Sequence, residues 1–256
     1  MELQLSGKRV LITGGSQGIG LAVAKGFAAE GANLHLVSRS KSKLEAAKQQ
    51  VSAIASVDIQ LHPFDLSDSR SIDELVLQCP DIDILVNNAG AVPGGDLLST
   101  DEGTWRRAWD LKIFGYINMA RAFYRAMQDR GGGVIVNVIG AAGDRPGYNF
   151  LAGASGNAAL MAFTRGLGSR SIDEGVRVVA VNPGGVETPR MVTLAEARAE
   201  RELGDPTRWR ELSSDLPLGR PAKAEEVADL VVFLSSERAS YVNATVVTID
   251  GGNSYR

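Results

Sequence analysis

The sequence predicts an α/β protein, a doubly wound sandwich in which helices cover both faces of a seven-stranded parallel sheet. The first observation is a series of short apolar, β-branched runs, typical of strands buried on both faces. These runs are residues 9–12, 34–37, 59–61, 82–86, 134–138, 176–181 and 246–249. The second is the helical pattern between consecutive runs. The third is the glycine content, 29 of 256 residues without a Gly-x-y period, which suits turns and close backbone approaches.

Helical periodicity occupies the gaps between the runs. After the first run, Ile19, Ala22, Val23 and Phe27 recur at the i, i+3, i+4, i+8 spacing of one apolar helix face. Two later helix faces keep a similar spacing: Ala158, Met161 and Ala162, and then Val227, Leu230, Val231 and Leu234. Strands that alternate with such helices are joined by right-handed crossovers, which place helices on both faces of the sheet.

The length predicts a single domain, residues 1–256, because one hydrophobic core can serve a chain of this size. Residues 186–216 interrupt the alternation of strands and helices. They are helical in composition but rich in charge, and Pro189 and Pro206 divide them. We expect this segment to be a mobile insertion over the cleft, in contact with substrate.

Composition excludes several classes of protein. The 27 Lys and Arg residues against 30 Asp and Glu give a formal charge of -3 without a basic stripe, so we expect no nucleic-acid partner. The first residues form no long apolar run, which predicts neither a signal peptide nor a membrane anchor, and hence a cytoplasmic protein. Cys79, the single cysteine, is expected to be a small apolar residue at a helix end, with no disulfide and no metal cluster. His35 and His62 lie in or beside strands and are expected to be structural.

A glycine-rich turn follows the first strand and opens the first helix. Backbone N–H groups and the helix dipole face a pyrophosphate in such a turn, and Gly18 and Gly20 allow a close approach that side chains would block. The pattern alone also suits a tight turn without a ligand. Together with the motifs that follow, it predicts dinucleotide binding by Gly14, Ser16, Gln17, Gly18, Ile19 and Gly20.

Motifs at four further places accompany the turn. They are Asp65-Leu66, Asn87-Asn88-Ala89-Gly90, Asn182-Pro183-Gly184 with Thr188-Pro189, and the closing Asp250-Gly251-Gly252. With these motifs the chain resembles the short-chain dehydrogenase/reductase family over nearly its whole length. The resemblance implies a Rossmann-like fold, a dinucleotide cofactor and oxidoreductase chemistry. It implies that Asp65 and Leu66 border the adenine, that Asn88, Ala89 and Gly90 back the adenosine ribose, and that Pro183, Gly184, Val186 and Thr188 flank the nicotinamide.

The end of the second strand bears on the choice between NADP(H) and NAD(H). An acidic residue there would hold the ribose hydroxyls and repel a 2′-phosphate, but this chain reads Ser38-Arg39-Ser40. Arg39 offers a charge-assisted pair of hydrogen bonds to a phosphate, which favours NADP(H) over NAD(H). The alternative is an arginine that only caps or solvates the loop.

The family's proton-transfer residues, an Asn, a Ser, a Tyr and a Lys, align with Lys112, Gly140, Gly153 and Asn157. A shift of register cannot restore the set, because no Tyr-x3-Lys occurs and no lysine lies between Lys112 and Lys223. The two glycines predict an opened, enlarged pocket. The resemblance therefore implies a divergent member that lacks the Ser-Tyr-Lys set.

Three residues are candidates for the missing chemistry. Lys112 has a stem long enough to bring an ammonium into the site, the alternative being a surface or interface lysine. Tyr148 is the only tyrosine expected within reach, the alternative being a ring packed at the cleft rim or in an interface. The amide of Asn157 can hydrogen-bond a ribose hydroxyl and would join the cofactor residues.

Three functions remain open from the sequence. The first is an NADP(H)-dependent oxidoreductase with a displaced acid/base, acting on an unknown small carbonyl or alcohol. The second is a catalytically inactive nucleotide-binding pseudoenzyme, and the third a non-redox enzyme, which the intact glycine turn disfavours. Lys112, Arg145 and Arg190 lend the cleft a cationic rim, which suggests an acidic substrate. By resemblance we expect a homodimer or homotetramer, paired through helices at about 105–130 and 152–173.

Overall fold

Strands and helices alternate along the chain in the predicted order. The computed structural model describes residues 2–256. The sheet strands are β1 (Arg9–Thr13), β2 (Asn33–Val37), β3 (Ile59–His62), β4 (Ile84–Asn87), β5 (Gly133–Val138), β6 (Val176–Pro183) and β9 (Val246–Ile249). All seven pair in parallel in the order β3-β2-β1-β4-β5-β6-β9, which confirms the predicted doubly wound sheet.

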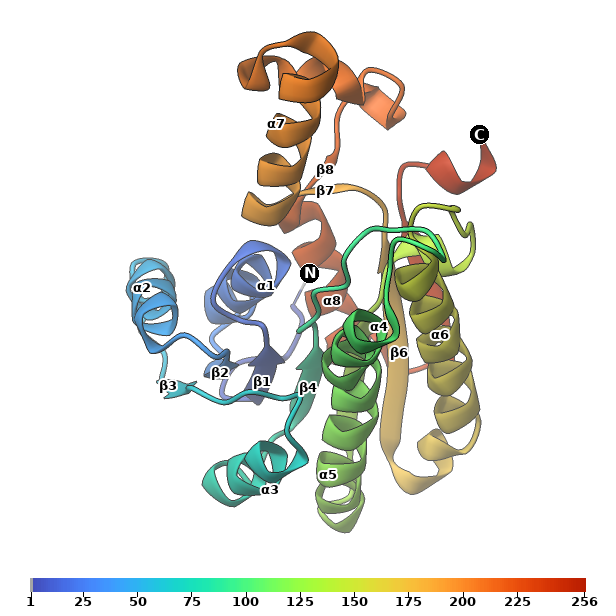
Figure 1. Cartoon of the computed structure of the whole chain (residues 1–256). Helices are drawn as coiled ribbons and strands as arrows, with labels where there is room; N and C mark the ends of the chain where they lie inside the picture. The colour runs from blue at the N-terminus through green and yellow to red at the C-terminus, as the bar shows by residue number, and fades with distance from the viewer. Residues whose placement is uncertain (1) are drawn as a thin grey trace.

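Helices cover both faces of this sheet (Figure 1). They are α1 (Gly18–Ala29), α2 (Lys41–Ser52), α3 (Ser69–Gln78), α4 (Glu102–Trp109), α5 (Gly115–Asp129), α6 (Leu151–Ser171), α7 (Pro189–Leu203) and α8 (Ala224–Ser235). Phe27 of α1 and Val231 of α8 are fully buried in the core on one face. Phe123 of α5 and Leu75 of α3 are buried in the core on the other face. Within residues 2–256, no helix has both the length and the apolar character needed to cross a membrane.

The segment after β6 builds a separate lobe, orange in Figure 1, which stands beyond the carboxyl ends of the strands. Thr188 caps α7 by accepting a hydrogen bond from the N–H of Met191 at 3.3 Å, and Pro189 fits the first turn because it has no N–H to satisfy. Short 3-10 helical turns at Pro206–Ser213 follow, with Trp209 buried. The helical character predicted for residues 186–216 is confirmed, and their mobility stays a prediction.

Helices α4 and α5 form one long helical rod, and a π-helical turn at Asp110–Phe114 joins them. A π turn widens the helix by one residue and is common at functional sites. Lys112 lies at its centre, and its side chain is buried in the described structure. The alternative of a surface or interface lysine is therefore wrong, and the lysine faces the interior of the fold.

Candidate active site

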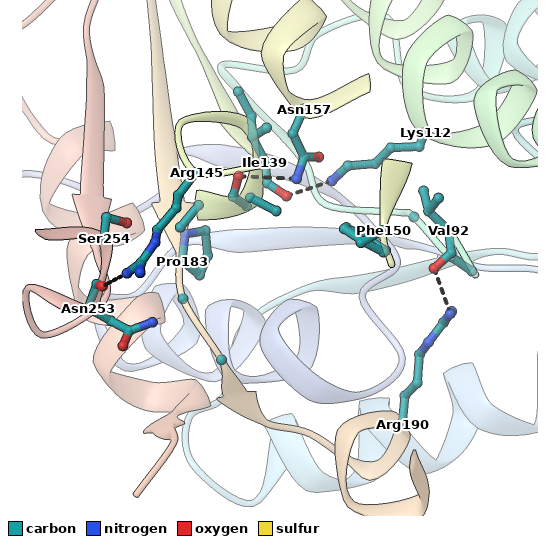
Figure 2. Close-up of a pocket in the computed structure, with 17 residues that line it drawn as sticks. Val92, Lys112, Ile139, Arg145, Phe150, Asn157, Pro183, Arg190, Asn253 and Ser254 are labelled. Atoms are coloured by element: carbon teal, nitrogen blue, oxygen red, sulfur yellow. Dashed lines mark hydrogen bonds between the residues drawn. The ribbon is translucent and has the colours of Figure 1, made fainter. Parts of the chain in front are cut away.

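Two adjoining cavities open at the carboxyl ends of the parallel strands, where open α/β sheets bind ligands. Cavity A, about 460 Å³, lies between the glycine turn, the end of β2 and the segment after β4. Cavity B, about 510 Å³, lies between the end of β5, α6, the segment after β6 and the C-terminal residues. Figure 2 shows the residues of cavity B. Both cavities share a wall that includes Gly90, Lys112, Gly140 and Pro183.

All but three of the predicted cofactor residues line cavity A. Those that do are Gly14, Ser16, Gln17, Gly18, Ile19, Ser38, Arg39, Leu66, Asn88, Ala89, Gly90, Pro183, Gly184, Val186 and Thr188. Of the others, Asn157 lines cavity B. Asp65 accepts hydrogen bonds from the N–H and hydroxyl of Ser67 at 3.1 and 2.8 Å. Gly20 is needed for packing, because a Cβ there would overlap the carbonyl oxygen of Gly14.

The glycine turn is held in place by the segment after β4. The hydroxyl of Thr13 accepts hydrogen bonds from the N–H groups of Asn88 and Ala89 at 2.8 and 3.0 Å. The amide of Asn88 donates to the carbonyl of Thr13 at 3.0 Å. Gln17 precedes α1 and makes no side-chain cap, so the first N–H groups of this helix have no side-chain acceptor. Gly18 and Ile19, its first residues, line cavity A. Such N–H groups suit an anion.

The end of β2 offers a polar, cationic corner of cavity A. Ser38 lines cavity A, and its buried hydroxyl has no hydrogen-bond partner within residues 2–256, which is unusual for a buried polar group. Arg39 is 70% exposed, and its nearest carboxylate, Asp65, is 3.9 Å away. Lys43, in the first turn of α2, also lines this corner. Lys43 was not predicted as a cofactor residue from the sequence, although its position three residues after the helix cap Ser40 places it in the first turn of α2, beside Arg39.

The side chain of Lys112 crosses the shared wall of the two cavities. Its Nζ donates to the hydroxyl of Tyr116 at 2.9 Å, to the carbonyl of Val138 at 2.9 Å and to the carbonyl of Ile139 at 3.1 Å. Gly90 makes room for its stem, because a Cβ there would lie 2.6 Å from Cδ of Lys112. Burial lowers the pKa of Lys112 to about 7. An amine with this pKa exchanges its proton readily at neutral pH.

Two tyrosines are placed differently from the expectation. Tyr148 is 69% exposed and lines neither cavity, so it lies outside the site that its sequence position suggested. Tyr116 is 1% exposed and contacts Lys112 directly. Neither tyrosine lines a cavity, so the expectation that Tyr148 lies within reach of the site is wrong, and Tyr116 acts on the site only through Lys112. The signal for Tyr116 was present in the sequence, since residues four apart share one helix face.

Neighbouring side chains fill the space beside the two aligned glycines. At Gly140 a Cβ would lie 2.8 Å from Nδ2 of Asn157, and φ is +142°, which few side chains adopt. Asn157 is buried and donates from that amide nitrogen to the carbonyl of Gly140 at 3.1 Å. At Gly153 a Cβ would overlap the ring of Phe150. The expectation that these glycines enlarge the pocket is therefore wrong.

Cavity B has a cationic lining. Arg145 donates to the carbonyl of Asn253 at 2.6 Å, and Arg190 donates to the carbonyl of Val92 at 2.9 Å (Figure 2). Within residues 2–256 neither guanidinium makes a salt bridge, and no carboxylate lines cavity B. Both arginines keep N–H donors for an anionic ligand.

His35, His62 and Cys79 lie together on the α3 side of the sheet, with ligand atoms within 4.8 Å of one another. No pattern in the sequence indicates this proximity. Nδ1 of His35 is 3.0 Å from Nε2 of His62, and the rings are tilted by only 11°, as in an in-plane hydrogen bond. Burial, with a smaller contribution from His62, lowers the pKa of His35 to about 4. The thiol of Cys79 donates to the carbonyl of Leu75 at 3.0 Å, and burial raises its pKa to about 12. Hydrogen bonds within the protein therefore satisfy the polar atoms named here, and they require no bound ligand.

The fold and the cavities define a class of protein, the doubly wound α/β proteins that bind a dinucleotide at the strand ends. The profile of the short chain dehydrogenase family matches residues 8–199. Galactitol 2-dehydrogenase (L-tagatose-forming) of Cereibacter sphaeroides is 34% identical over 255 residues, which cover 97% of this chain and 96% of that protein. The 2,3-dihydro-2,3-dihydroxybenzoate dehydrogenase of Bacillus subtilis is 32% identical over 252 residues, with coverage of 97% and 96%.

Solved structures give the same result. L-sorbose reductase from Gluconobacter frateurii, complexed with NADPH and L-sorbose, matches with a TM-score of 0.92 and 32% identity over 98% of each chain. The chain therefore belongs to the short-chain dehydrogenase family, with the seven-stranded Rossmann-like fold of that family. Its relatives are oxidoreductases, and the fold binds NAD(P).

Proposed function

We propose that this protein is an NADP(H)-dependent oxidoreductase of small carbonyl or alcohol compounds, with a non-standard active site. The observation that supports it most is the wall shared by cavities A and B, which contains Lys112. A dinucleotide in cavity A and a substrate in cavity B would meet at this wall. When bound, the nicotinamide supplies or takes up a hydride. The protein holds both molecules and moves the proton.

The cofactor residues divide by chemistry. The N–H groups at the start of α1 would hold the pyrophosphate, and the orphaned hydroxyl of Ser38 would hydrogen-bond the adenosine part. Arg39 and Lys43 would hold a 2′-phosphate at the N-terminus of α2, where the helix dipole favours an anion. As the family resemblance implies, Asp65 and Leu66 would border the adenine, and Asn88, Ala89 and Gly90 would back the adenosine ribose. Pro183, Gly184, Val186 and Thr188 would flank the nicotinamide, and Asn157 would hydrogen-bond a ribose hydroxyl.

The Arg39→Ala variant tests the cofactor preference. We expect NADPH binding to weaken about tenfold or more, because a charge-assisted pair with phosphate contributes about 1.5 kcal/mol or more. NADH binding should change little, because NADH has no 2′-phosphate. Both affinities are measured by calorimetric titration of the purified protein. Equal losses for the two dinucleotides would contradict the NADP(H) assignment.

The acid/base set is displaced. Lys112 reaches the shared wall with an amine whose burial brings its pKa to about 7, whereas Gly140 and Gly153 carry no functional group. Asn157 bonds the carbonyl of Gly140 and presents its amide to cavity B. Tyr148 is exposed outside both cavities, so the proposed chemistry does not use it.

The substrate is acidic. Arg145 and Arg190 line cavity B without a carboxylate partner, and a substrate carboxylate between them would supply the missing charge. We expect NADPH-dependent turnover of small oxo acids, with a KM about tenfold or more below that of their methyl esters, which keep the ketone and lose the charge. NADPH oxidation followed by absorbance measures both series. Tight NADPH binding without turnover of any carbonyl would point instead to a nucleotide-binding protein without catalysis.

The chain is also proposed to be one domain, in which residues 186–216 move to cover the substrate. The subunits pair through α4 with α5 and through α6 into a homodimer or homotetramer. The location is the cytoplasm, with neither nucleic acid nor membrane as a partner.

A further inference from the structure

Lys112 and Tyr116 form a buried pair at the π-helical turn. They are four residues apart, so both side chains lie on one face of the rod formed by α4 and α5. Nζ of Lys112 is 2.9 Å from the hydroxyl of Tyr116 and 4.6 Å from the centre of its ring. The order, lysine before tyrosine, is the reverse of Tyr-x3-Lys. Lys112 lines the cavities, whereas Tyr116 lies behind it and lines neither.

The hydrogen bonds of the pair contain one redundancy. An ammonium has three N–H donors, and Lys112 has three acceptors, namely the Tyr116 hydroxyl and the carbonyls of Val138 and Ile139. The Val138 carbonyl also accepts from the Tyr116 hydroxyl at 2.8 Å. It therefore stays satisfied if Lys112 turns one N–H toward a ligand. A substrate oxygen at the shared wall can take that N–H without leaving a buried acceptor unpaired.

The hydroxyl of Tyr116 can serve both protonation states of Lys112. Beside an ammonium it accepts from Nζ and donates to Val138, as the distances show. Beside a neutral amine it can rotate and donate to the nitrogen lone pair. Burial raises the pKa of Tyr116 well above its ordinary value, so its own proton is not available to a substrate.

We propose that Nζ of Lys112 is the proton donor and acceptor of the displaced active site, and that Tyr116 is the residue that positions it. This inference rests on the proposed oxidoreductase function. In the reductive direction the substrate carbon receives a hydride, and thus two electrons, from the reduced dinucleotide, which becomes oxidised. The carbonyl oxygen takes a proton from the Lys112 ammonium and becomes a hydroxyl. The neutral amine regains a proton from water.

The groups that face Lys112 set its protonation. The loop before α6 and the start of α7 bring the cations Arg145 and Arg190 to cavity B, and Arg39 and Lys43 lie in cavity A. From α6 comes the neutral amide of Asn157, and the end of β5 contributes carbonyls. Among the described residues no carboxylate lines either cavity. Burial disfavours the ammonium, while the three hydrogen-bond acceptors favour it.

Competitive labelling tests the pair without a substrate. The dinucleotide-free protein is treated with trace acetic anhydride across a pH series, and the acetylation of each lysine is followed by mass spectrometry. The exposed Lys41 serves as the internal reference. We expect Lys112 to label with a midpoint near pH 7, and the Tyr116→Phe variant to lower that midpoint by about half a unit or more, because the ammonium loses an acceptor. Tyr124→Phe, which removes an exposed hydroxyl bonded to Glu174, is the matched control.

A midpoint for Lys112 equal to that of Lys41, or unchanged in Tyr116→Phe, would overturn the pairing. Once an oxo acid is turned over, the rate of reduction should fall at pH values above the Lys112 midpoint. In Tyr116→Phe, this descending limb of the pH–rate profile should move to lower pH by the same amount as the labelling midpoint. A limb that stays in place while the labelling midpoint moves would overturn the catalytic role. If no carbonyl reacts although the labelling results are as expected, the proposed function fails and the pairing stands.

Discussion

From pH 7 to pH 9, the free energy of unfolding of the wild-type protein should rise by about 2 kcal/mol more than that of the Lys112→Met variant. The pKa of Lys112 is about 7 in the folded protein, and that of an unfolded lysine is about 10.4. Between these values the unfolded chain binds one proton more than the folded chain, so stability rises with pH in this window. Methionine has a similar length and does not titrate. Urea unfolding at pH 7 and pH 9 measures the gain in each protein.

The pH-dependent gain separates charge from packing. Removal of Lys112 also leaves the carbonyl of Ile139 without its lysine partner, and this loss should be nearly the same at both pH values. Lys41→Met, at an exposed position, is the control and should keep the wild-type gain. If wild type and Lys112→Met differ by a constant amount, Lys112 does not titrate in this window, and the proposed acid/base has the wrong pKa.

A buried lysine that weakens the fold at neutral pH argues for function. Desolvation of an ammonium is unfavourable, and core positions that only need packing are usually filled by apolar side chains. Lys112 lies instead at a π-helical turn, beside two cavities, with a lowered pKa. Perturbed pKa values in clefts are typical of functional sites.

The sheet and the glycine turn could be predicted because their signals are local. Buried parallel strands read as continuous apolar runs, so β5 and β6 were visible from their valines. The turn before α1 was visible because Gly14, Gly18 and Gly20 follow a strand directly. These signals depend on neighbours in the chain and need no knowledge of the tertiary contacts.

The features that could not be predicted depend on contacts between distant segments. Whether His35 meets His62 depends on the register of β2 on β3, in which Val37 is the partner of His62. Tyr116 was overlooked because the family motif places tyrosine before lysine, although a helix face permits either order. The ring of Phe150 reaches Gly153 from the residue just before α6, and its direction is set by tertiary packing.

The Gly153→Tyr variant should be destabilised by about 1–3 kcal/mol, because its Cβ would overlap the Phe150 ring and overpacking in a filled site has this magnitude. The Gly166→Tyr variant on the same helix α6 is the matched control, since nothing lies within 4 Å of a Cβ there. It should change stability much less. Urea unfolding of both variants measures the difference.

The double variant Gly153→Tyr/Phe150→Ala decides whether the ring is the cause. Removal of the ring should recover most of the loss, which gives a favourable coupling energy of about 1 kcal/mol or more in the double-mutant cycle. Additive losses, or equal losses at positions 153 and 166, would show that Phe150 does not fill the space. With coupling, a tyrosine at 153 requires a change at 150 as well.

Asn157 would obstruct a serine at 140 in the same way. Its amide nitrogen lies 2.8 Å from the position that a Cβ on residue 140 would take, and it bonds the Gly140 carbonyl. Asn157→Lys removes that amide, but the positive φ at position 140 and the Phe150 ring beside position 153 remain. The three substitutions Gly140→Ser, Gly153→Tyr and Asn157→Lys, without a change at Phe150, should therefore not rebuild the Ser-Tyr-Lys set.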